Sequence, residues 1–209
     1  MGDTQPAPLA PLKISCTDSD CEQGLHCFKF HSRRMAAGDR GKCRSCGADL
    51  IDWKRVHRRD EADAAYTFAA LKLELIRHHI WHVAIDDGAM AHARRKGMVR
   101  LLTAARHRLE KSLAPAEPAR DGQQTPFKGN AIYLAQHATA CCCRTCLEYW
   151  HAIPKGRVLT AEEVDYAHGL VAAYLRERLP DLKEEPEKVP RRGHRSDAPR
   201  PADDGRTPA

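Results

Sequence analysis

The sequence predicts a mainly α-helical protein, with a core of four to five helices, one or two short strands and a zinc-ribbon-like module at its N-terminus. Three observations predict this fold class. Apolar residues recur at helical spacing through the middle of the chain, and the region before it is rich in cysteine but poor in aliphatic residues. In addition, eight of the thirteen prolines lie in the two ends of the chain, where no packed core is expected.

Four segments follow from these changes in composition along the 209 residues. Residues 1–13 and 183–209 are expected to be disordered, because both are rich in proline and the second is highly charged, with Val189 as its one sizeable aliphatic residue. Residues 14–59 are expected to form a zinc-binding module. Residues 60–182 are expected to form a helical domain with a second metal centre.

The helical domain is expected to begin with a long helix over residues 60–83, because its apolar residues fall into stripes at helical spacing. A short helical piece between Gly88 and Gly97 then precedes a helix over about residues 98–113. Pro115 terminates that helix, since proline disrupts a helix interior.

A loop over residues 117–130 leads into one predicted short strand at residues 131–135. The last helix has an explicit start, because Thr160-x-x-Glu163 is the pattern of a capping box. Apolar residues then keep the helical period until Pro180.

The N-terminal module carries the spacing of a zinc knuckle. In Cys43-Arg-Ser-Cys46-Gly47 two thiolates three residues apart can bind one ion, and the glycine permits the turn that follows. Unconnected buried thiols would not explain five cysteines within 31 residues. The expected ligands of this structural zinc are Cys16, Cys21, Cys43 and Cys46. Because the Cys16–Cys21 spacing is loose, one ligand could instead be Cys27, His26 or His31.

A second group of metal-ligating residue types lies between residues 137 and 151. Cys143 and Cys146 can chelate one ion from the first turn of a helix. Adjacent cysteines rarely all bind one ion, so one or two of the three consecutive cysteines should be spectators. The expected ligands are His137, Cys142, Cys143 and Cys146, with His151 as a further ligand or beside one. An iron–sulfur cluster, a reactive cysteine next to Arg144 and simple packing stay open as alternatives.

The segments around this second group resemble an uncharacterised bacterial family that is described as a domain of unknown function. Its hallmark is an Asp-Gly-x-Gln-Thr-Pro-x-x-Gly loop, followed by Gln-His-Ala-Thr-Ala-x-Cys-Cys-x-x-Cys-Leu and Trp-His-x-Ile-Pro-Lys-Gly-Arg-x-Leu. These motifs occupy residues 121–129, 136–147 and 150–159 here. The resemblance covers residues 109–182, or starts at 98 if the preceding helix is included, and leaves out the N-terminal module.

The resemblance implies a working site but no reaction. The family pattern typically has threonine before its cysteine pair, where this chain has Cys141, so Cys141 is the expected spectator. The residues that match the motif, and that the resemblance supports as a site, are His137, Cys142, Cys143 and Cys146.

The coordination number would decide what the second centre does. Four protein ligands would make it closed and structural, whereas three ligands and an open position would admit water. The Thr125–Gly129 loop could line such an opening, with Lys128 and Arg144 meeting an anionic substrate. The closed version is favoured, because Glu148 is the one identifiable base nearby.

Histidines on the predicted long helix offer a further site. His78 and His82 are one turn apart and could bind a metal, but His79 stands where the H-E-x-x-H pattern has its glutamate base. Hydrogen-bonded histidines between packed layers are an equal alternative.

Basic residues form two patches that flank the predicted long helix, within a moderate net charge of +6. Lysine and arginine near a zinc ribbon commonly contact phosphates, whereas a run of charge is usually a solvated face. The residues expected to contact nucleic acid are Arg55, Arg58, Arg59, Arg95, Arg100 and Lys111.

These observations favour a cytoplasmic zinc protein with two sites that contacts nucleic acid, in DNA or RNA processing, repair or defence. One alternative is a metal-dependent enzyme, of the hydrolase, nuclease or glycosylase class, acting at the C-terminal His/Cys centre. The other is an iron–sulfur or redox protein. No membrane partner is expected, since no apolar run is long enough to span a bilayer. The motifs of NTPases, dinucleotide dehydrogenases and serine hydrolases are absent.

Overall fold

The computed structural model describes residues 14–189. Its elements confirm the predicted mainly α-helical fold class, and within the described range the strand-like structure consists of two isolated bridges. Among these residues, none of the helices combines the length and apolar character that a membrane span requires. The α-helices are α1 (Trp53–His57), α2 (Ala64–Lys72), α3 (Leu75–His82), α4 (Asp87–Ser112), α5 (Ala131–Ala138), α6 (Arg144–His151) and α7 (Ala161–Arg178).

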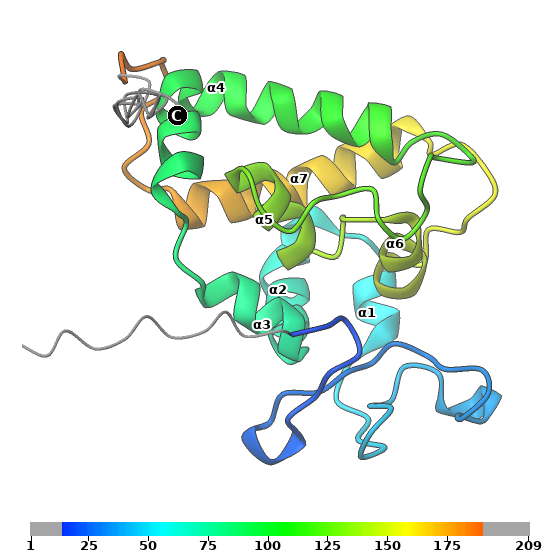
Figure 1. Ribbon diagram of the computed structural model, residues 1–209. Helices are drawn as coiled ribbons and strands as arrows, with labels where there is room; N and C mark the ends of the chain where they lie inside the picture. Colours follow the sequence, from blue (N-terminus) through cyan, green and yellow to red (C-terminus); the bar gives the residue numbers. More distant parts are fainter. Residues whose placement is uncertain (1–13, 190–209) are drawn as a thin grey trace, which may run out of the picture.

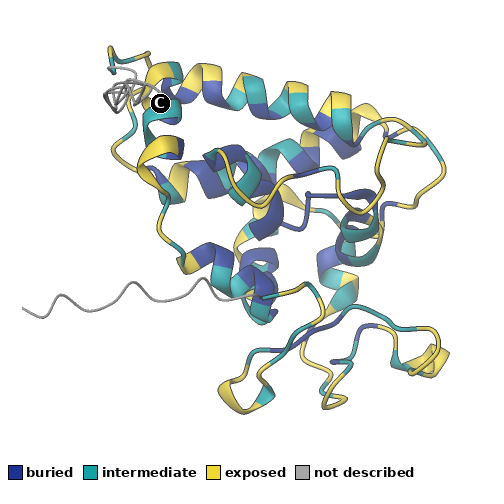
Figure 2. Ribbon diagram, viewed as in Figure 1, coloured by how far each residue is buried: buried dark blue, intermediate teal, exposed yellow. Residues whose placement is uncertain are grey.

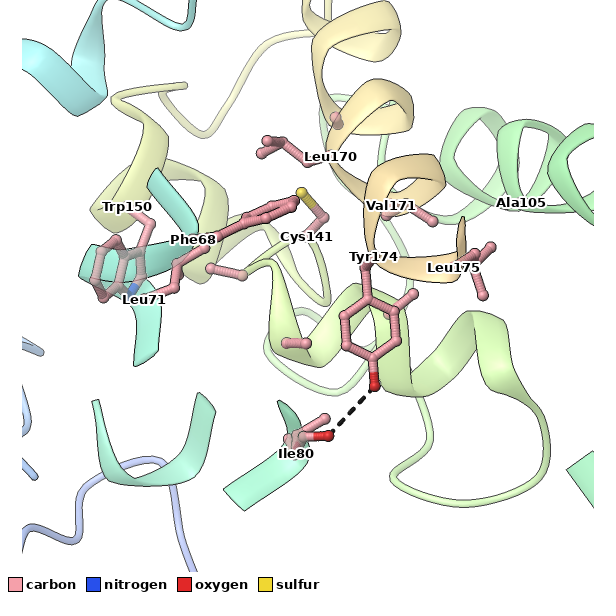
Figure 3. Close-up of a cluster of buried hydrophobic side chains, with 14 of the residues drawn as sticks. Phe68, Leu71, Ile80, Ala105, Cys141, Trp150, Leu170, Val171, Tyr174 and Leu175 are labelled. Carbon is pink, nitrogen blue, oxygen red and sulfur yellow. Dashed lines mark hydrogen bonds between the residues drawn. The ribbon is translucent and has the colours of Figure 1, made fainter. Parts of the chain in front are cut away.

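The core lies where α5 packs against α3, α4 and α7, and Figure 1 shows α4 and α7 running along one side of the molecule. Figure 3 shows the side chains that fill this core, with the Tyr174 hydroxyl donating to the carbonyl oxygen of Ile80 at 3.3 Å. Trp150 and Leu71 are fully buried in the same cluster. Figure 2 shows that the N-terminal module, by contrast, is largely exposed or half-buried.

The predicted long helix over residues 60–83 is wrong, because the chain breaks it into a short 3₁₀ turn followed by α2 and α3. The break has a visible cause. The His26 N–H donates to the carbonyl oxygen of Leu73 at 2.7 Å, and the Leu75 N–H donates to the carbonyl oxygen of His26 at 2.9 Å. The N-terminal module therefore takes the backbone hydrogen bonds that a continuous helix would have used.

The strand predicted at residues 131–135 is also wrong, since these residues form the first turns of α5. The Asn130 side chain accepts a hydrogen bond from the Tyr133 N–H at 3.1 Å, which caps the helix at its start. Ile132 and Ala135 then fall on one buried face of that helix.

The helix expected over residues 98–113 is the second part of α4, which bends at Gly97 with φ of 69°. Residues 183–187 run beside this bend. The N–H of Met98 donates to the carbonyl oxygen of Lys183 at 2.8 Å, and the N–H of Glu187 donates to that of Arg94 at 2.8 Å. A Cβ atom at position 97 would lie 2.5 Å from the Glu184 carbonyl oxygen, so glycine permits this contact.

The predicted disordered tail therefore begins too early at residue 183. Residues 183–187 are held by backbone hydrogen bonds that a count of charges and prolines could not reveal. The disorder expected for residues 1–13 and 190–209 falls outside the described residues.

The predicted capping box at the start of α7 is confirmed. The Thr160 side chain accepts from the Glu163 N–H, and the Glu163 carboxylate accepts from the Thr160 N–H. Glu163 also pairs with Arg157 and Arg59 at 2.5 and 3.0 Å. Hydrogen bonds from Arg157, ahead of those from Thr160 and Arg59, lower the pKa of this carboxyl group from its ordinary 4.5 to about 2.

Replacing Glu163 with glutamine is therefore expected to destabilise the protein by ~2 kcal/mol at neutral pH. Since the folded-state pKa is depressed, the carboxylate stabilises the fold fully above pH 4.5, and that contribution is lost as the pH falls through about 2. Thermal unfolding of the wild-type protein and the Glu163→Gln variant across this pH range measures the difference in stability. Any metal loss at low pH affects both proteins equally and cancels in the difference. A difference that stays constant down to pH 2 would contradict the prediction.

Candidate metal centres

The structure gathers one group of metal-ligating side chains in the N-terminal module. Single ligand atoms of Cys21, His26, Cys43 and Cys46 all lie within 4.8 Å of one another. The sulfur atoms of Cys21 and Cys43 are 3.7 Å apart, and the Cys46 sulfur is 3.5 Å from Nδ1 of His26. Three thiolates and one imidazole at these separations fit a single tetrahedral ion, for which a Zn–S distance of about 2.3 Å is typical. We call these four residues the N-terminal group.

Two turns and a bridge deliver these ligands. Asp20 and Leu25 exchange backbone hydrogen bonds of 2.7 and 2.9 Å, which folds the chain back so that His26 lies beside Cys21. Gly47, with φ of 77°, closes the second turn by donating to the carbonyl oxygen of Cys43 at 2.8 Å. Burial of Cys43 raises its thiol pKa, but hydrogen bonds from surrounding backbone groups outweigh this and lower it to about 6. The turns thus favour the thiolate that metal binding needs.

The N-terminal group differs from the expected ligand set in one residue. His26 stands where the sequence favoured Cys16, as one of the open alternatives allowed. The reason is the turn over residues 20–25, which brings His26 back beside Cys21. Cys16 lies elsewhere, on the wall of a cavity beside the second group of cysteines.

The second group consists of Cys142, Cys143 and Cys146, whose sulfur atoms lie within 4.8 Å of one another. Cys142 and Cys146 are separated by 3.4 Å. Cys143 occupies the position directly before the first residue of α6, so Cys146 follows it by one turn on the same side. We call these three residues the thiol group.

Cys141 is not part of the thiol group. Figure 3 shows its sulfur directed into the core among Phe68 and Leu170, and its S–H contacts the carbonyl oxygen of Thr139 at 3.5 Å. Burial raises the pKa of this thiol to about 12, which keeps it protonated. This is the spectator position that the resemblance implied.

A buried arginine stands behind the thiol group. Arg77 donates to the Cys146 sulfur at 3.2 Å, to the His137 carbonyl oxygen at 2.5 Å and to the Glu74 carboxylate at 3.2 Å. The Trp150 N–H donates to the same carboxylate at 3.0 Å. Hydrogen bonds from Cys142 and its neighbour Cys143, and then the charge of Arg77, lower the pKa of Cys146 well below its ordinary value.

The two expected histidines have different surroundings. Nε2 of His137 lies 3.1 Å from the carbonyl oxygen of Thr125, which can only accept, so this nitrogen carries the proton. Nδ1 of His137 is buried and has no hydrogen-bond partner among the described residues. Nδ1 is not one of the atoms that form the thiol group, but its free lone pair could bind a metal ion or accept a proton. Burial, and then the charge of Arg77, lowers the His137 pKa to about 4, so the ring is neutral at pH 7.

His151 is not a ligand in this arrangement. Its Nε2 lies 2.9 Å from the Thr139 carbonyl oxygen and its Nδ1 lies 3.1 Å from the Tyr166 hydroxyl, so both ring nitrogens are engaged. His151 is close to the cysteines in the sequence, but its ring packs against Tyr166 of α7 instead, with ring centroids 5.4 Å apart.

The thiol group faces a cavity of about 750 Å³, which we call the thiol cavity. The predicted loop contributes Thr125, Pro126 and Phe127 to the wall, whereas Lys128 is not in it. Arg144, expected to meet a substrate, instead donates to three backbone carbonyl groups and holds loops together. The other polar residues of the wall include Cys16 and Lys29 of the N-terminal module, Glu74, Arg77, Arg108, Arg120, Gln124, His137 and Tyr149.

Sequence reasoning missed the buried pair of Glu74 and Arg77 as part of this site. The sequence did carry a signal for Arg77, because this charged residue stands among the apolar residues Ile76 and Ile80. These three residues lie on the buried part of α3. The rings of His78 and His82 are in contact, with centroids 4.2 Å apart and planes inclined by 34°, but the two residues belong to neither group of potential ligands.

The two basic patches differ in how far their charges are already paired. Arg55 and Arg58 lie 2.5 and 3.6 Å from Asp63, and Arg59 pairs with Glu163. The second patch lies on α4, where three exposed cations form no ion pair with any described residue. These are Arg95, Arg100 and Lys111.

Comparison with known sequences places this fold in a family. No solved structure matches the chain. Residues 65–176, from α2 to near the end of α7, match the family described as Domain of unknown function (DUF4186), which confirms the resemblance and extends it towards the N-terminus. The match contains the thiol group and leaves out the N-terminal group. Because it spans more than half of the chain, this protein belongs to the DUF4186 family and carries a Cys/His module ahead of the family domain.

Proposed function

We propose that the protein binds two zinc ions and that the second is the centre of a hydrolytic enzyme acting on an anionic substrate. The observation that carries this proposal is the position of the thiol group, whose three potential ligands face a cavity large enough for a small molecule. The N-terminal group has four potential ligands and would form a closed, structural site.

The spacing of the sulfur atoms favours a single ion over an iron–sulfur cluster. Thiolates on one tetrahedral zinc lie about 3.8 Å apart, which follows from a Zn–S distance of about 2.3 Å. The separations of 3.4 Å for Cys142–Cys146 and 3.7 Å for Cys21–Cys43 are close to this value. A 4Fe–4S cluster binds each thiolate through a different iron, and a 2Fe–2S cluster binds at most two thiolates through one iron. Either cluster would therefore spread three sulfur atoms farther apart than the 4.8 Å within which those of the thiol group lie. Thiolate ligands also need reduced cysteines, which is consistent with a cytoplasmic location.

The charges around the thiol group support a resident cation. Three thiolates and Glu74 would place four negative charges in a buried site that offers Arg77 as its positive partner. A divalent ion removes most of the remaining imbalance. The residues that would hold it are Cys142, Cys143 and Cys146.

The residues of the thiol cavity suit hydrolysis of an anion. A zinc ion bound by three protein ligands supplies a Lewis acid and an acidic water. His137 is neutral at pH 7 and its Nδ1 is free to accept a proton. Lys29 and Arg120 line the wall and attract a negative charge.

Nucleic-acid contact stays a second proposal, restricted to α4. Its support is that Arg95, Arg100 and Lys111 are exposed and form no ion pair with a described residue. The patch at Arg55 and Arg59 is not proposed to contact nucleic acid, because these residues already form ion pairs with Asp63 and Glu163.

Cobalt substitution tests the open second site. The purified full chain is expected to be colourless and to contain two zinc ions. After exchange for Co²⁺, inorganic phosphate should shift the visible absorption bands of one of the two ions, because an open position accepts a new ligand. In Cys146→Ser the shift should disappear, whereas Cys141→Ser, which alters the spectator thiol, should retain it. Brown protein that contains iron, or cobalt bands that no anion shifts, would refute the proposal.

A further inference from the structure

We propose that the thiol cavity binds a nucleotide, with the base stacked on Phe127 and the phosphate held by the cations of the wall. This inference rests on the proposed function of the site and names its substrate class. It depends on three features of the cavity wall, which are an exposed aromatic ring, buried polar atoms without partners and unpaired cations.

The first feature is an aromatic surface at the mouth of the cavity. The ring of Phe127 stacks on that of His137 with centroids 4.1 Å apart and planes inclined by 11°. His137 is buried and fixed by its hydrogen bond to Thr125, so it supports the phenyl ring from below. Phe127 is nonetheless 53% exposed, which leaves its other face open. An exposed, rigidly supported aromatic ring beside cations is the arrangement on which bases stack.

The second feature is a set of polar atoms without partners. Among the described residues, the Tyr149 hydroxyl, Oε1 of Gln124 and Nδ1 of His137 are buried and form no hydrogen bond. All three residues line the thiol cavity. Burial raises the pKa of Tyr149 well above its ordinary value, so its hydroxyl remains a donor. Buried polar atoms without partners are costly, and a ligand with donors and acceptors on one edge, such as a base, would satisfy them.

The third feature is the distribution of positive charge. Arg108 is occupied, because it donates to Gln136 and to the carbonyl oxygen of Gln124 and so positions the loop. Lys29 and Arg120 form no ion pair with a described residue and remain available for a phosphate. A volume of about 750 Å³ accommodates one nucleotide, since pockets for small molecules span roughly 300–1,000 Å³.

Isothermal titration of the zinc-loaded full chain tests this inference. The probes are inorganic phosphate, ribose 5-phosphate, the four nucleoside 5′-monophosphates and a short single-stranded oligonucleotide. At least one nucleoside monophosphate should bind about tenfold or more tightly than ribose 5-phosphate, because stacking of one base has that effect. Phe127→Ala should remove this advantage without changing the zinc content. Val99→Ala should not, because Val99 is equally exposed, at 52%, but lies outside the cavity wall.

The outcomes separate this inference from the function on which it rests. Equal affinity for ribose 5-phosphate and every nucleotide would overturn the inference, while phosphate-sensitive cobalt bands would still support the open metal site. An advantage that survives in Phe127→Ala would overturn it as well. If the oligonucleotide binds more tightly than the monophosphate, the inference is supported and the ligand is a base within a strand. If it binds equally or more weakly, the inference is supported and the ligand is a free nucleotide.

Discussion

Replacing Cys43 with serine is expected to remove one zinc ion per chain and to unfold the N-terminal module. Among residues 14–52 the structure describes two 3₁₀ turns and no α-helix, and few side chains there are buried. Such a segment buries too little apolar surface to offset its conformational entropy. A structural zinc contributes about 10–16 kcal/mol of apparent binding free energy, so its loss should be decisive.

Metal analysis and near-ultraviolet circular dichroism measure this effect, with Cys16→Ser as the control. The sequence favoured Cys16 as a ligand of the same ion, whereas the structure places His26 there. Cys16→Ser should therefore keep the N-terminal zinc, and His26→Ala should lose it. If Cys16→Ser loses this zinc and His26→Ala retains it, the arrangement in the structure is incorrect.

The loss should also reach the second site, because the module is joined to the helical domain. Phe28 is fully buried and meets the ring of Trp150 at a centroid distance of 6.2 Å. The backbone of His26 pairs with the chain on either side of Glu74. His26, a potential ligand of the N-terminal group, is therefore bonded to the chain around Glu74. The Glu74 carboxylate in turn pairs with Arg77, which contacts the thiol group.

The parts of the fold that the sequence predicted are those encoded by local chemistry. The capping box at Thr160 is satisfied by residues three positions apart, and Cys143 and Cys146 meet because a helical turn separates them. The helical period before Pro180 likewise needs no distant partner. Each signal acts within one or two turns of chain, so the residues alone determine it.

The errors arose where distant segments decide the outcome. Nothing near Leu73 ends a helix, but the backbone of His26 pairs there. Cys16 has a plausible spacing to Cys21, yet the turn over residues 20–25 places His26 beside Cys21 instead. The strand expected at residues 131–135 is a helix because Asn130 caps it and α3, α4 and α7 surround it. Pairing across the fold was therefore the information that periodicity could not supply.

Replacing Arg77 with methionine is the substitution expected to destabilise the helical domain most. Both partners of the Arg77–Glu74 pair are almost completely buried, with side chains 2% and 3% exposed. Methionine fills a similar volume but leaves the Glu74 carboxylate without a cation and removes the Arg77 hydrogen bond to the His137 carbonyl oxygen. Breaking a buried pair in this way costs about 3–5 kcal/mol. Arg106→Met should cost at most about 1 kcal/mol, since Arg106 also pairs with two carboxylates but is 41% exposed.

Urea unfolding of the zinc-loaded proteins measures these differences, and a second substitution isolates their cause. If the unpaired carboxylate is responsible, Glu74→Gln added to Arg77→Met should restore part of the lost stability, because it removes the buried charge. The glutamine can still accept from the Trp150 N–H, which donates to Glu74 at 3.0 Å. If instead the double variant is no more stable than Arg77→Met, the loss comes from the thiolates that Arg77 contacts, and metal content should then fall in both variants. A cost for Arg77→Met no larger than that for Arg106→Met would show that Arg77 does not hold the site together.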